Sequence, residues 1–149
     1  MNVFKYYSVT HRIQALQNSA LRIICFRKPR TSATPLYADL GLLKIFHQVE
    51  VMNILYVHKH LNGNLPIDSL KTLTFEKIHH SIGTKGNTTG LLSRPNINTT
   101  RFGLHSFSRL SINQWNNLQK SVPNLNLSEI NLSQLKSLST KFYAINYKC

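Results

Sequence analysis

The sequence predicts an all-α fold: about five helices in a small bundle, with a long basic loop between the third and fourth helices. Two observations support this prediction. Apolar residues recur at three- and four-residue steps in several stretches, and Pro, Gly and Asn mark the breaks between them. The 149 residues, 42% of them hydrophobic, suffice for one ordinary domain or two very small ones. We divide the chain into an N-terminal helical unit (1–66), a basic loop region (67–106) and a C-terminal helical pair (107–149).

The first helix is expected in HRIQALQNSALRIICF, with Thr10 as a cap before its start. One helical face collects Ile13, Leu16, Ala20, Leu21 and Ile24. The segment RKPR (27–30) follows this helix, and its Pro29 cannot continue it. Cations at this end suit the negative pole of the helix dipole.

Two more helices are expected before residue 66. A short one of about two turns has Thr34 as its N-cap, Pro35 at its first position and Gly41 at its exit. The next lies in LLKIFHQVEVMNILYVHKHLNG and stops at the turn pair Asn62–Gly63. Its apolar stripe comprises Ile45, Val49, Met52, Leu55 and Tyr56.

Periodicity fades from about residue 70 to 106, where Gly, Asn, Thr and Ser predominate, so a loop or weak extended structure is expected. A fourth helix is predicted in SINQWNNLQKSV, ending at Pro123. A fifth is predicted in SEINLSQLKSLSTKFY, with Ser128 as its cap. Its apolar face comprises Leu132, Leu135, Leu138 and Phe142.

The charge balance indicates the class of partner. Eighteen Lys and Arg face five Asp and Glu, which gives a net charge of +13 and a pI near 10.2. Such an excess favours a polyanion, with nucleic acid first and an anionic membrane surface second, the alternative being a merely basic protein. Cys25 and Cys149 form no metal-spaced pair. Without an apolar run typical of a signal peptide or a membrane span, we expect a nuclear or cytoplasmic protein that is not secreted and has no membrane partner.

The stretch PLYADLGLL differs by one residue from the Tyr-x-Asp-Asp metal-binding box of reverse transcriptases. That chemistry needs two divalent cations held by carboxylates. Leu40 stands where the second aspartate would be, the only other aspartate is Asp68, and the stretch reads as a helix. We therefore predict no catalytic residue, no metal, no cofactor and no enzymatic activity. Tyr37 and its apolar neighbours would pack, and Asp39 would lie in the first helical turn.

Other chemical motifs are weak. His58, His60, His79 and His80 have no Cys or carboxylate at zinc-ligand spacing. The segment GTKGNTTG lacks the residue order and the strand-to-helix context of a phosphate-binding loop.

Four segments, taken in order, resemble a known family. They are LQNSALRII, PLYADLGLLKIFHQVEVMNILYVHKHLNGNLP, HSIGTK and TRFGLHSFSRLSINQWNNL. Together they resemble the C-terminal region that follows the polymerase palm in non-LTR (LINE-like, jockey/CR1-type) retrotransposon reverse transcriptases. Among the matching positions are Gln17, Asn18, Tyr37, Gly41, Asn62, Gly63, His80, Thr84, Thr100, Gly103, Phe107, Trp115 and Asn116.

The sequence departs from the family pattern at several positions. Ile82, Gly83 and Lys85 differ in the HSIGTK loop, Ser111 replaces a glycine, and Gln119 replaces the proline after W-N-x-L. The resemblance implies an origin in an RNA-directed DNA polymerase of a mobile element and a capacity to handle nucleic acid. It does not imply polymerase activity, because the palm, its catalytic aspartates and the endonuclease are not in this sequence.

The candidate nucleic-acid-binding residues fall into two basic groups: Arg22, Arg27, Lys28 and Arg30, and then Lys85, Arg94, Arg101 and Arg109. Lys and Arg contact phosphates without sequence preference, so we expect non-specific binding of RNA or DNA. The alternative for these residues is a solvated face. Phe102, Phe107 and Trp115 could stack on bases. For Phe107 and Trp115 we favour the other interpretation, that they anchor the last helices in the core.

Two other functions compete with this one. The chain could be a structural module that docks on a polymerase core, in cis or in trans, and binds no nucleic acid itself. It could also be a sequence-specific DNA binder with a recognition helix. No predicted helix presents the dense Arg, Asn and Gln surface that such a binder needs.

Overall fold

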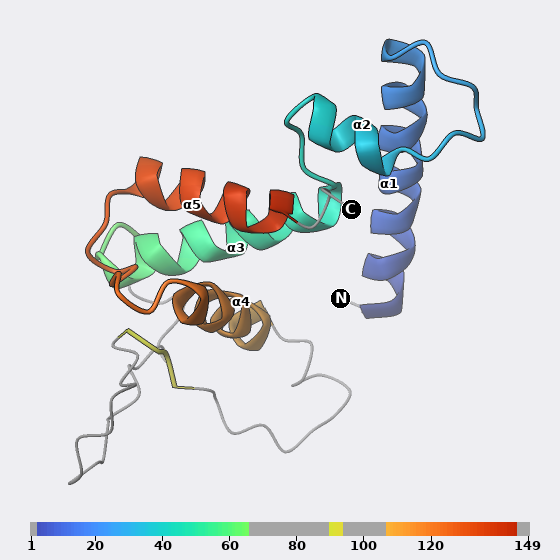
Figure 1. The fold of residues 1–149 in the computed structure, drawn as a ribbon. Helices are drawn as coiled ribbons and strands as arrows, with labels where there is room; N and C mark the ends of the chain where they lie inside the picture. The colour runs from blue at the N-terminus through green and yellow to red at the C-terminus, as the bar shows by residue number, and fades with distance from the viewer. Residues whose placement is uncertain (1–2, 66–89, 94–106, 146–149) are drawn as a thin grey trace, which may run out of the picture. The chain divides into compact units, whose positions relative to one another are not determined.

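The computed structural model describes residues 3–65, 90–93 and 107–145, and five α-helices lie within them (Figure 1). They are α1 (Val3–Ile24), α2 (Thr34–Asp39), α3 (Ile45–Leu61), α4 (Phe107–Ser121) and α5 (Leu132–Ala144). The all-α prediction is confirmed. Apart from residues 90–93, the predicted basic loop lies outside the described residues, and the division at residues 66 and 106 stays a prediction.

The chain forms two compact units, and the boundary between them falls within α3 and within α5. Unit 1 comprises Met1–Val51 and Leu138–Cys149, and unit 2 comprises Met52–Ser137.

Helix α1 of unit 1 begins much earlier than expected. It starts at Val3, so Thr10 lies inside the helix and is buried, and the prediction that Thr10 caps it is wrong. Residues 3–9 contain neither Pro nor Gly, so nothing stops the helix from extending upstream. Leu21 of the predicted apolar face is buried, whereas Ile13, Leu16 and Ile24 are exposed.

The short helix α2 is bounded by backbone geometry. Its N-cap is Ala33 without a side-chain bond, so Thr34 is not the cap; the Thr34 hydroxyl instead accepts a bond of 3.4 Å from Lys44 Nζ. The predicted exit at Gly41 is confirmed, since Gly41 has φ +64°. The N–H groups of Gly41 and Leu42 donate to the carbonyls of Ala38 and Tyr37 at 3.2 and 2.9 Å, which is a Schellman motif.

Asp39 also lies elsewhere than predicted. It is the last residue of the six-residue α2, not part of its first turn, and it is exposed. At that position its negative charge faces the negative pole of the helix dipole, so the helix gains no electrostatic support from it.

Polar side chains of α1 connect the elements of unit 1. The fully buried Tyr37 hydroxyl donates to Asn18 Oδ1 at 2.8 Å and accepts from Gln14 Nε2 at 2.6 Å. The first backbone N–H of α3, that of Ile45, donates to the side-chain oxygens of Gln14 and Gln17 at 3.0 and 3.1 Å. Helix α1 thus positions both α2 and the start of α3 through carboxamides rather than through its apolar face.

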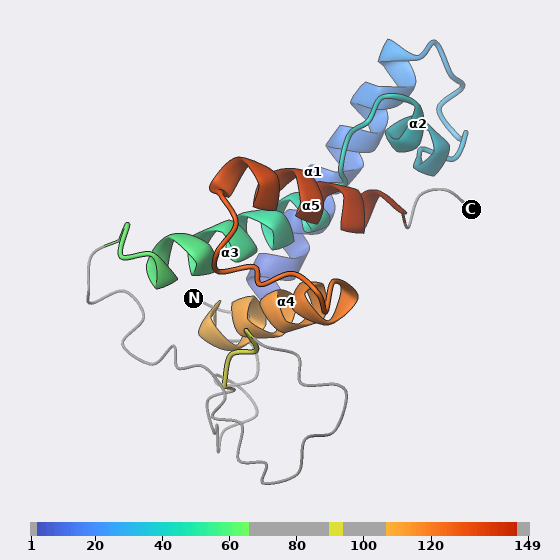
Figure 2. The ribbon, with the colours of Figure 1, turned by 60° about the vertical axis from the view of Figure 1, so that its left-hand side comes forward.

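Helix α4 of unit 2 packs on the second half of α3 (Figure 2). Asn53 Nδ2 donates to Gln114 Oε1 at 2.9 Å, and the rings of Tyr56 and Phe107 meet edge to face at 5.1 Å. The fully buried side chains of this core are Ile54, Val57, Leu92, Ser111, Ile112, Trp115, Leu118, Gln119, Leu127 and Leu135.

Three neighbouring side chains of α4 hold two non-helical segments in place. The Trp115 indole donates to the Gly90 carbonyl at 3.0 Å, and the Asn116 carboxamide pairs with both backbone groups of Leu92. Gln119 donates to the Leu125 carbonyl at 2.5 Å and accepts from the Leu127 N–H at 3.0 Å. Buried backbone groups need such partners wherever no helix or sheet supplies them.

The start of α5 corrects another predicted cap. The helix begins at Leu132, and Asn131 Oδ1 accepts from the Gln134 N–H at 2.8 Å while Gln134 Oε1 accepts from the Asn131 N–H at 3.4 Å. This reciprocal pair is a capping box. Ser128 lies upstream of it, and its hydroxyl donates to Asn126 Oδ1 at 2.8 Å.

Candidate nucleic-acid interface

The first basic group surrounds the end of α1. The N–H of Phe26 donates to the Ile23 carbonyl at 3.1 Å, and that of Arg27 to the Arg22 carbonyl at 2.8 Å. This is a second Schellman motif, and Phe26 takes the left-handed position with φ +52°. The helix therefore ends immediately before the cations at 27, 28 and 30.

Arg22 stabilises the loop that carries these cations. Its Nε donates to the Thr31 carbonyl at 2.7 Å, and the Thr31 N–H donates to the Lys28 carbonyl at 3.0 Å. Arg22 is half-buried, whereas Arg27, Lys28 and Arg30 are exposed. The four predicted residues thus lie at the same end of α1. Arg22 also has a structural role, because its hydrogen bond to Thr31 holds the loop.

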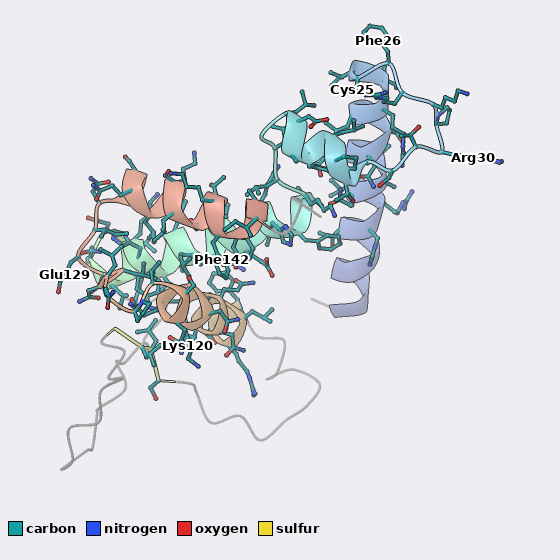
Figure 3. The ribbon with its side chains drawn as sticks, in the orientation of Figure 1. Cys25, Phe26, Arg30, Lys120, Glu129 and Phe142 are labelled. Atoms are coloured by element: carbon teal, nitrogen blue, oxygen red, sulfur yellow. The ribbon has the colours of Figure 1, made fainter. Side chains whose placement is uncertain are left out.

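The surroundings of this loop in the sequence are entirely basic. No Asp or Glu precedes Asp39 in the sequence. The cations that precede it are Lys5, Arg12 and the four residues of the first basic group. Figure 3 shows Arg30 projecting from the loop that follows α1 and Phe26 at the end of the helix itself. Because three exposed cations lie within four residues, a phosphate chain could contact more than one of them at a time.

The second basic group is described only in part. Lys85, Arg94 and Arg101 lie outside the described residues. Arg109 is half-buried on α4 in unit 2. Placement of this group as a cluster therefore stays a prediction.

The aromatic side chains proposed to stack on bases have different surroundings. Trp115 is 0% exposed and donates its indole N–H within unit 2, so it is a core residue, as the alternative reading held. Phe107 is 45% exposed and contacts the edge of Tyr56, so it does not lie in the core. Phe102 lies outside the described residues.

Phe26 is a candidate functional residue that sequence reasoning missed. Its side chain is 97% exposed, next to the cations of the first basic group. The sequence offered one indication, the aromatic residue in CFRKPR, but nothing in the letters shows that the ring faces solvent. We call Phe26, Arg27, Lys28 and Arg30 the α1 tip.

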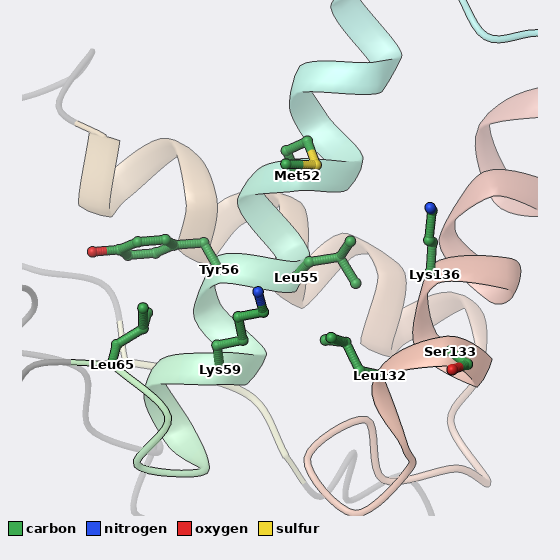
Figure 4. A pocket seen from close by; sticks show the side chains of 8 residues that line it. All are labelled: Met52, Leu55, Tyr56, Lys59, Leu65, Leu132, Ser133 and Lys136. Atoms are coloured by element: carbon green, nitrogen blue, oxygen red, sulfur yellow. The ribbon is translucent and has the colours of Figure 1, made fainter.

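Unit 2 carries an open groove of about 330 Å³ between the second half of α3 and the first half of α5 (Figure 4). Met52, which is 65% exposed, Leu55 and Leu132 give it an apolar surface, and Lys59 and Lys136 also line it. Tyr56, Leu65 and Ser133 complete the lining. Such a surface suits an apolar side chain from a partner with acidic neighbours.

Within the part of the chain that the structure describes, no group of three His, Cys, Asp or Glu could hold a metal. His58 is a buried side chain, its Nε2 lies 2.8 Å from the Ile130 carbonyl oxygen, and its ring lies beside Trp115. His79 and His80 lie outside the described residues.

One histidine of unit 1 has a shifted pKa. The His47 ring stacks on Tyr143 with centroids 5.2 Å apart, and burial, followed by the charge of Lys44, lowers the His47 pKa. Burial also raises the pKa of Tyr143, with a smaller contribution from Glu50. Both shifts favour the neutral forms of the two stacked rings.

Comparison with known proteins gives no match to a family model, a curated protein or a solved structure. Among the described residues, no helix has the length and apolar character needed to cross a bilayer.

Proposed function

We propose that this chain is part of a retroelement protein and corresponds to the region that follows the palm in non-LTR reverse transcriptases. We further propose that it binds RNA or DNA non-specifically. The observation that carries the proposal is the α1 tip, where three exposed cations follow a helix end in a stretch without acidic residues. The net charge of +13 supports the same partner.

The proposed role is binding rather than catalysis. Asp39 is the one acid of the polymerase-like motif, and it is an exposed carboxylate at the end of α2. Two-metal catalysis needs several carboxylates converging on one site. Tyr37, the other residue of that motif, is fully buried, and its hydroxyl is hydrogen-bonded to Gln14 and Asn18 of α1.

The test is the salt dependence of binding, measured by fluorescence anisotropy with random 20-mers of RNA and DNA. The wild type should bind at low salt and weaken steeply as salt rises. Replacing Arg27, Lys28 and Arg30 together by Gln should make the slope of log K against log salt shallower by about two to three.

A matched control carries Lys59, Lys120 and Lys141 as Gln, because these cations are exposed and belong to other helices than α1. This control lowers the net charge by the same amount as the tip variant. If the tip is the contact site, the slope of the control should stay closer to that of the wild type. Equal slopes for the two triple variants would show that net charge alone, without the tip, determines binding. A wild type that shows no retention on heparin at low salt would refute nucleic-acid binding altogether.

The groove of unit 2 favours a second candidate function, a docking module for a polymerase core. Its exposed Met52 and its two lysines suit an apolar anchor between acidic residues on a partner. Met52→Asp combined with Leu132→Asp should abolish co-purification with a palm-containing core and leave the salt slope with nucleic acid unchanged. Unchanged co-purification would argue against docking through this groove.

A further inference from the structure

We infer that Phe26 stacks on an unpaired base, so that the α1 tip prefers single-stranded RNA or DNA to duplex. This inference rests on the proposed nucleic-acid binding and specifies its substrate class. It is argued from the exposure of Phe26, its backbone conformation and the cations beside it.

The first observation is the exposure of the ring. Phe26 is 97% exposed at the end of α1, although a phenylalanine side chain is ordinarily stabilised by burial. The described residues of unit 1 leave this ring in solvent, so packing does not account for it.

The second observation is the backbone. Phe26 has φ +52° and is the only described residue other than glycine with a positive φ. In the Schellman motif that ends α2, the corresponding position is Gly41 with φ +64°. A side chain at this position strains the backbone, and glycine would relieve the strain. A strained, exposed aromatic residue points to a role for the ring itself.

The third observation is the chemistry of the loop that follows. Between Arg27 and Ser32 it holds three cations, and Pro29 is its only apolar residue. The bond from Arg22 to the Thr31 carbonyl holds this loop close to the helix end. An aromatic ring followed by cations matches a base next to its own phosphates. In a duplex the bases are already stacked, so the ring would have no partner.

The same loop makes a membrane surface the weaker interpretation. Ile23 and Ile24 are exposed three and two residues before Phe26 and could contact lipid, but the loop beyond Phe26 offers only Pro29 to acyl chains. Stacking also requires a planar ring, whereas contact with lipid requires only apolar area. Substitutions that separate these two properties therefore distinguish the partners.

The experiment compares three variants of Phe26 in the full chain, with a random single-stranded 20-mer, the matching duplex and phosphatidylserine vesicles as probes. Phe26→Gly relieves the backbone strain, so the fold should be at least as stable as the wild type. It should bind the single strand about tenfold more weakly and the duplex unchanged. Phe26→Leu should behave like Phe26→Gly, and Phe26→Trp like the wild type.

Three outcomes would overturn the inference. In the first, Phe26→Gly binds the single strand with wild-type affinity while the triple tip variant binds more weakly. This result would leave the proposed function intact but would rule out stacking by Phe26. In the second, Phe26→Leu still binds vesicles and the Phe26 substitutions leave the affinity for nucleic acid unchanged. This result would assign the tip to membranes. Absence of binding by the wild type to either nucleic acid would instead refute the proposed function.

Discussion

The carboxamide of Asn116 pairs with the backbone of Leu92 through two hydrogen bonds. Asn116 Oδ1 accepts from the Leu92 N–H at 2.9 Å, and Asn116 Nδ2 donates to the Leu92 carbonyl at 2.8 Å. Both residues are buried, and Asn116 lies 24 positions after Leu92 in the sequence. The pair therefore ties α4 to a segment that is distant in the chain.

Asn116→Ala should destabilise unit 2 by about 2–4 kcal/mol, because it leaves a buried N–H and a buried carbonyl without partners. Urea unfolding followed by tryptophan fluorescence measures this, since Trp115 is the only tryptophan and lies in this core. Asn117→Ala, on the exposed side of α4, is the control and should change stability by less than about 0.5 kcal/mol. Equal effects of the two substitutions would contradict the role assigned to Asn116.

Gly90→Ala should be more damaging than Gly63→Ala. Gly90 has φ +90°, and a Cβ there would lie 2.9 Å from Asn126 Oδ1 and 3.0 Å from Gln119 Oε1. Gly63 has φ +69°, and among the described residues beyond its two chain neighbours no atom lies within 4 Å of its Cβ position, so it reports the backbone strain alone. We expect a loss of about 1 kcal/mol at Gly63 and clearly more at Gly90. A comparison of urea midpoints decides this, and a smaller loss at Gly90 would be inconsistent with the close approach.

Tyr37→Phe should destabilise unit 1 by about 1–2 kcal/mol, because Asn18 and Gln14 lose their shared hydroxyl partner in the interior. Hydrogen exchange of the α2 amides, compared with that of α4, reports the loss. The control is Tyr56→Phe, which keeps the ring contact with Phe107. Faster exchange confined to α4 would contradict the assignment.

The lowered pKa of His47 should make folding sensitive to mild acid. The unfolded chain, with an ordinary pKa near 6.5, binds more protons than the folded chain between that pH and the lower folded pKa. Stability is therefore full above about pH 6.5 and falls as the pH drops through the folded pKa. His47→Phe keeps a ring to stack on Tyr143 and should remove this part of the decline. Identical pH profiles of unfolding free energy in wild type and variant would contradict the prediction.

Asp39→Asn should leave nucleic-acid affinity and stability nearly unchanged, because the carboxylate is exposed at the end of α2. Primer extension with Mg²⁺ or Mn²⁺ should stay at background for wild type and variant alike. Extension that depended on Asp39 would overturn the assignment of α2 as a packing helix.

The helices themselves could be predicted, because apolar periodicity and Pro–Gly breaks are local properties. The position of Trp115 in the core and the exit of α2 at Gly41 were predictable for the same reason. Helix starts were not: Thr10 and Ser128 are good capping residues, but a longer α1 and the Asn131–Gln134 capping box superseded them. Both alternatives are also local sequence features, so the sequence offers several helix starts without ranking them.

The candidate site was predictable in charge but not in shape. RKPR marked the cations of the α1 tip, whereas the exposure and backbone conformation of Phe26 depend on how α1 ends. Gln119 shows the same limit. It replaces the proline of the family pattern that the sequence resembles. Only the fold reveals that its carboxamide bonds to the backbone of Leu125 and Leu127.

The carboxamide contacts between α1 and its neighbours have a thermal consequence. Polar surface exposed on unfolding lowers the heat capacity, whereas apolar surface raises it. Gln14, Gln17 and Asn18 are half-buried against α2 and the start of α3, so their polar groups become exposed when unit 1 unfolds. These contacts should therefore flatten the stability curve of unit 1 and reduce the stability that it loses on cooling.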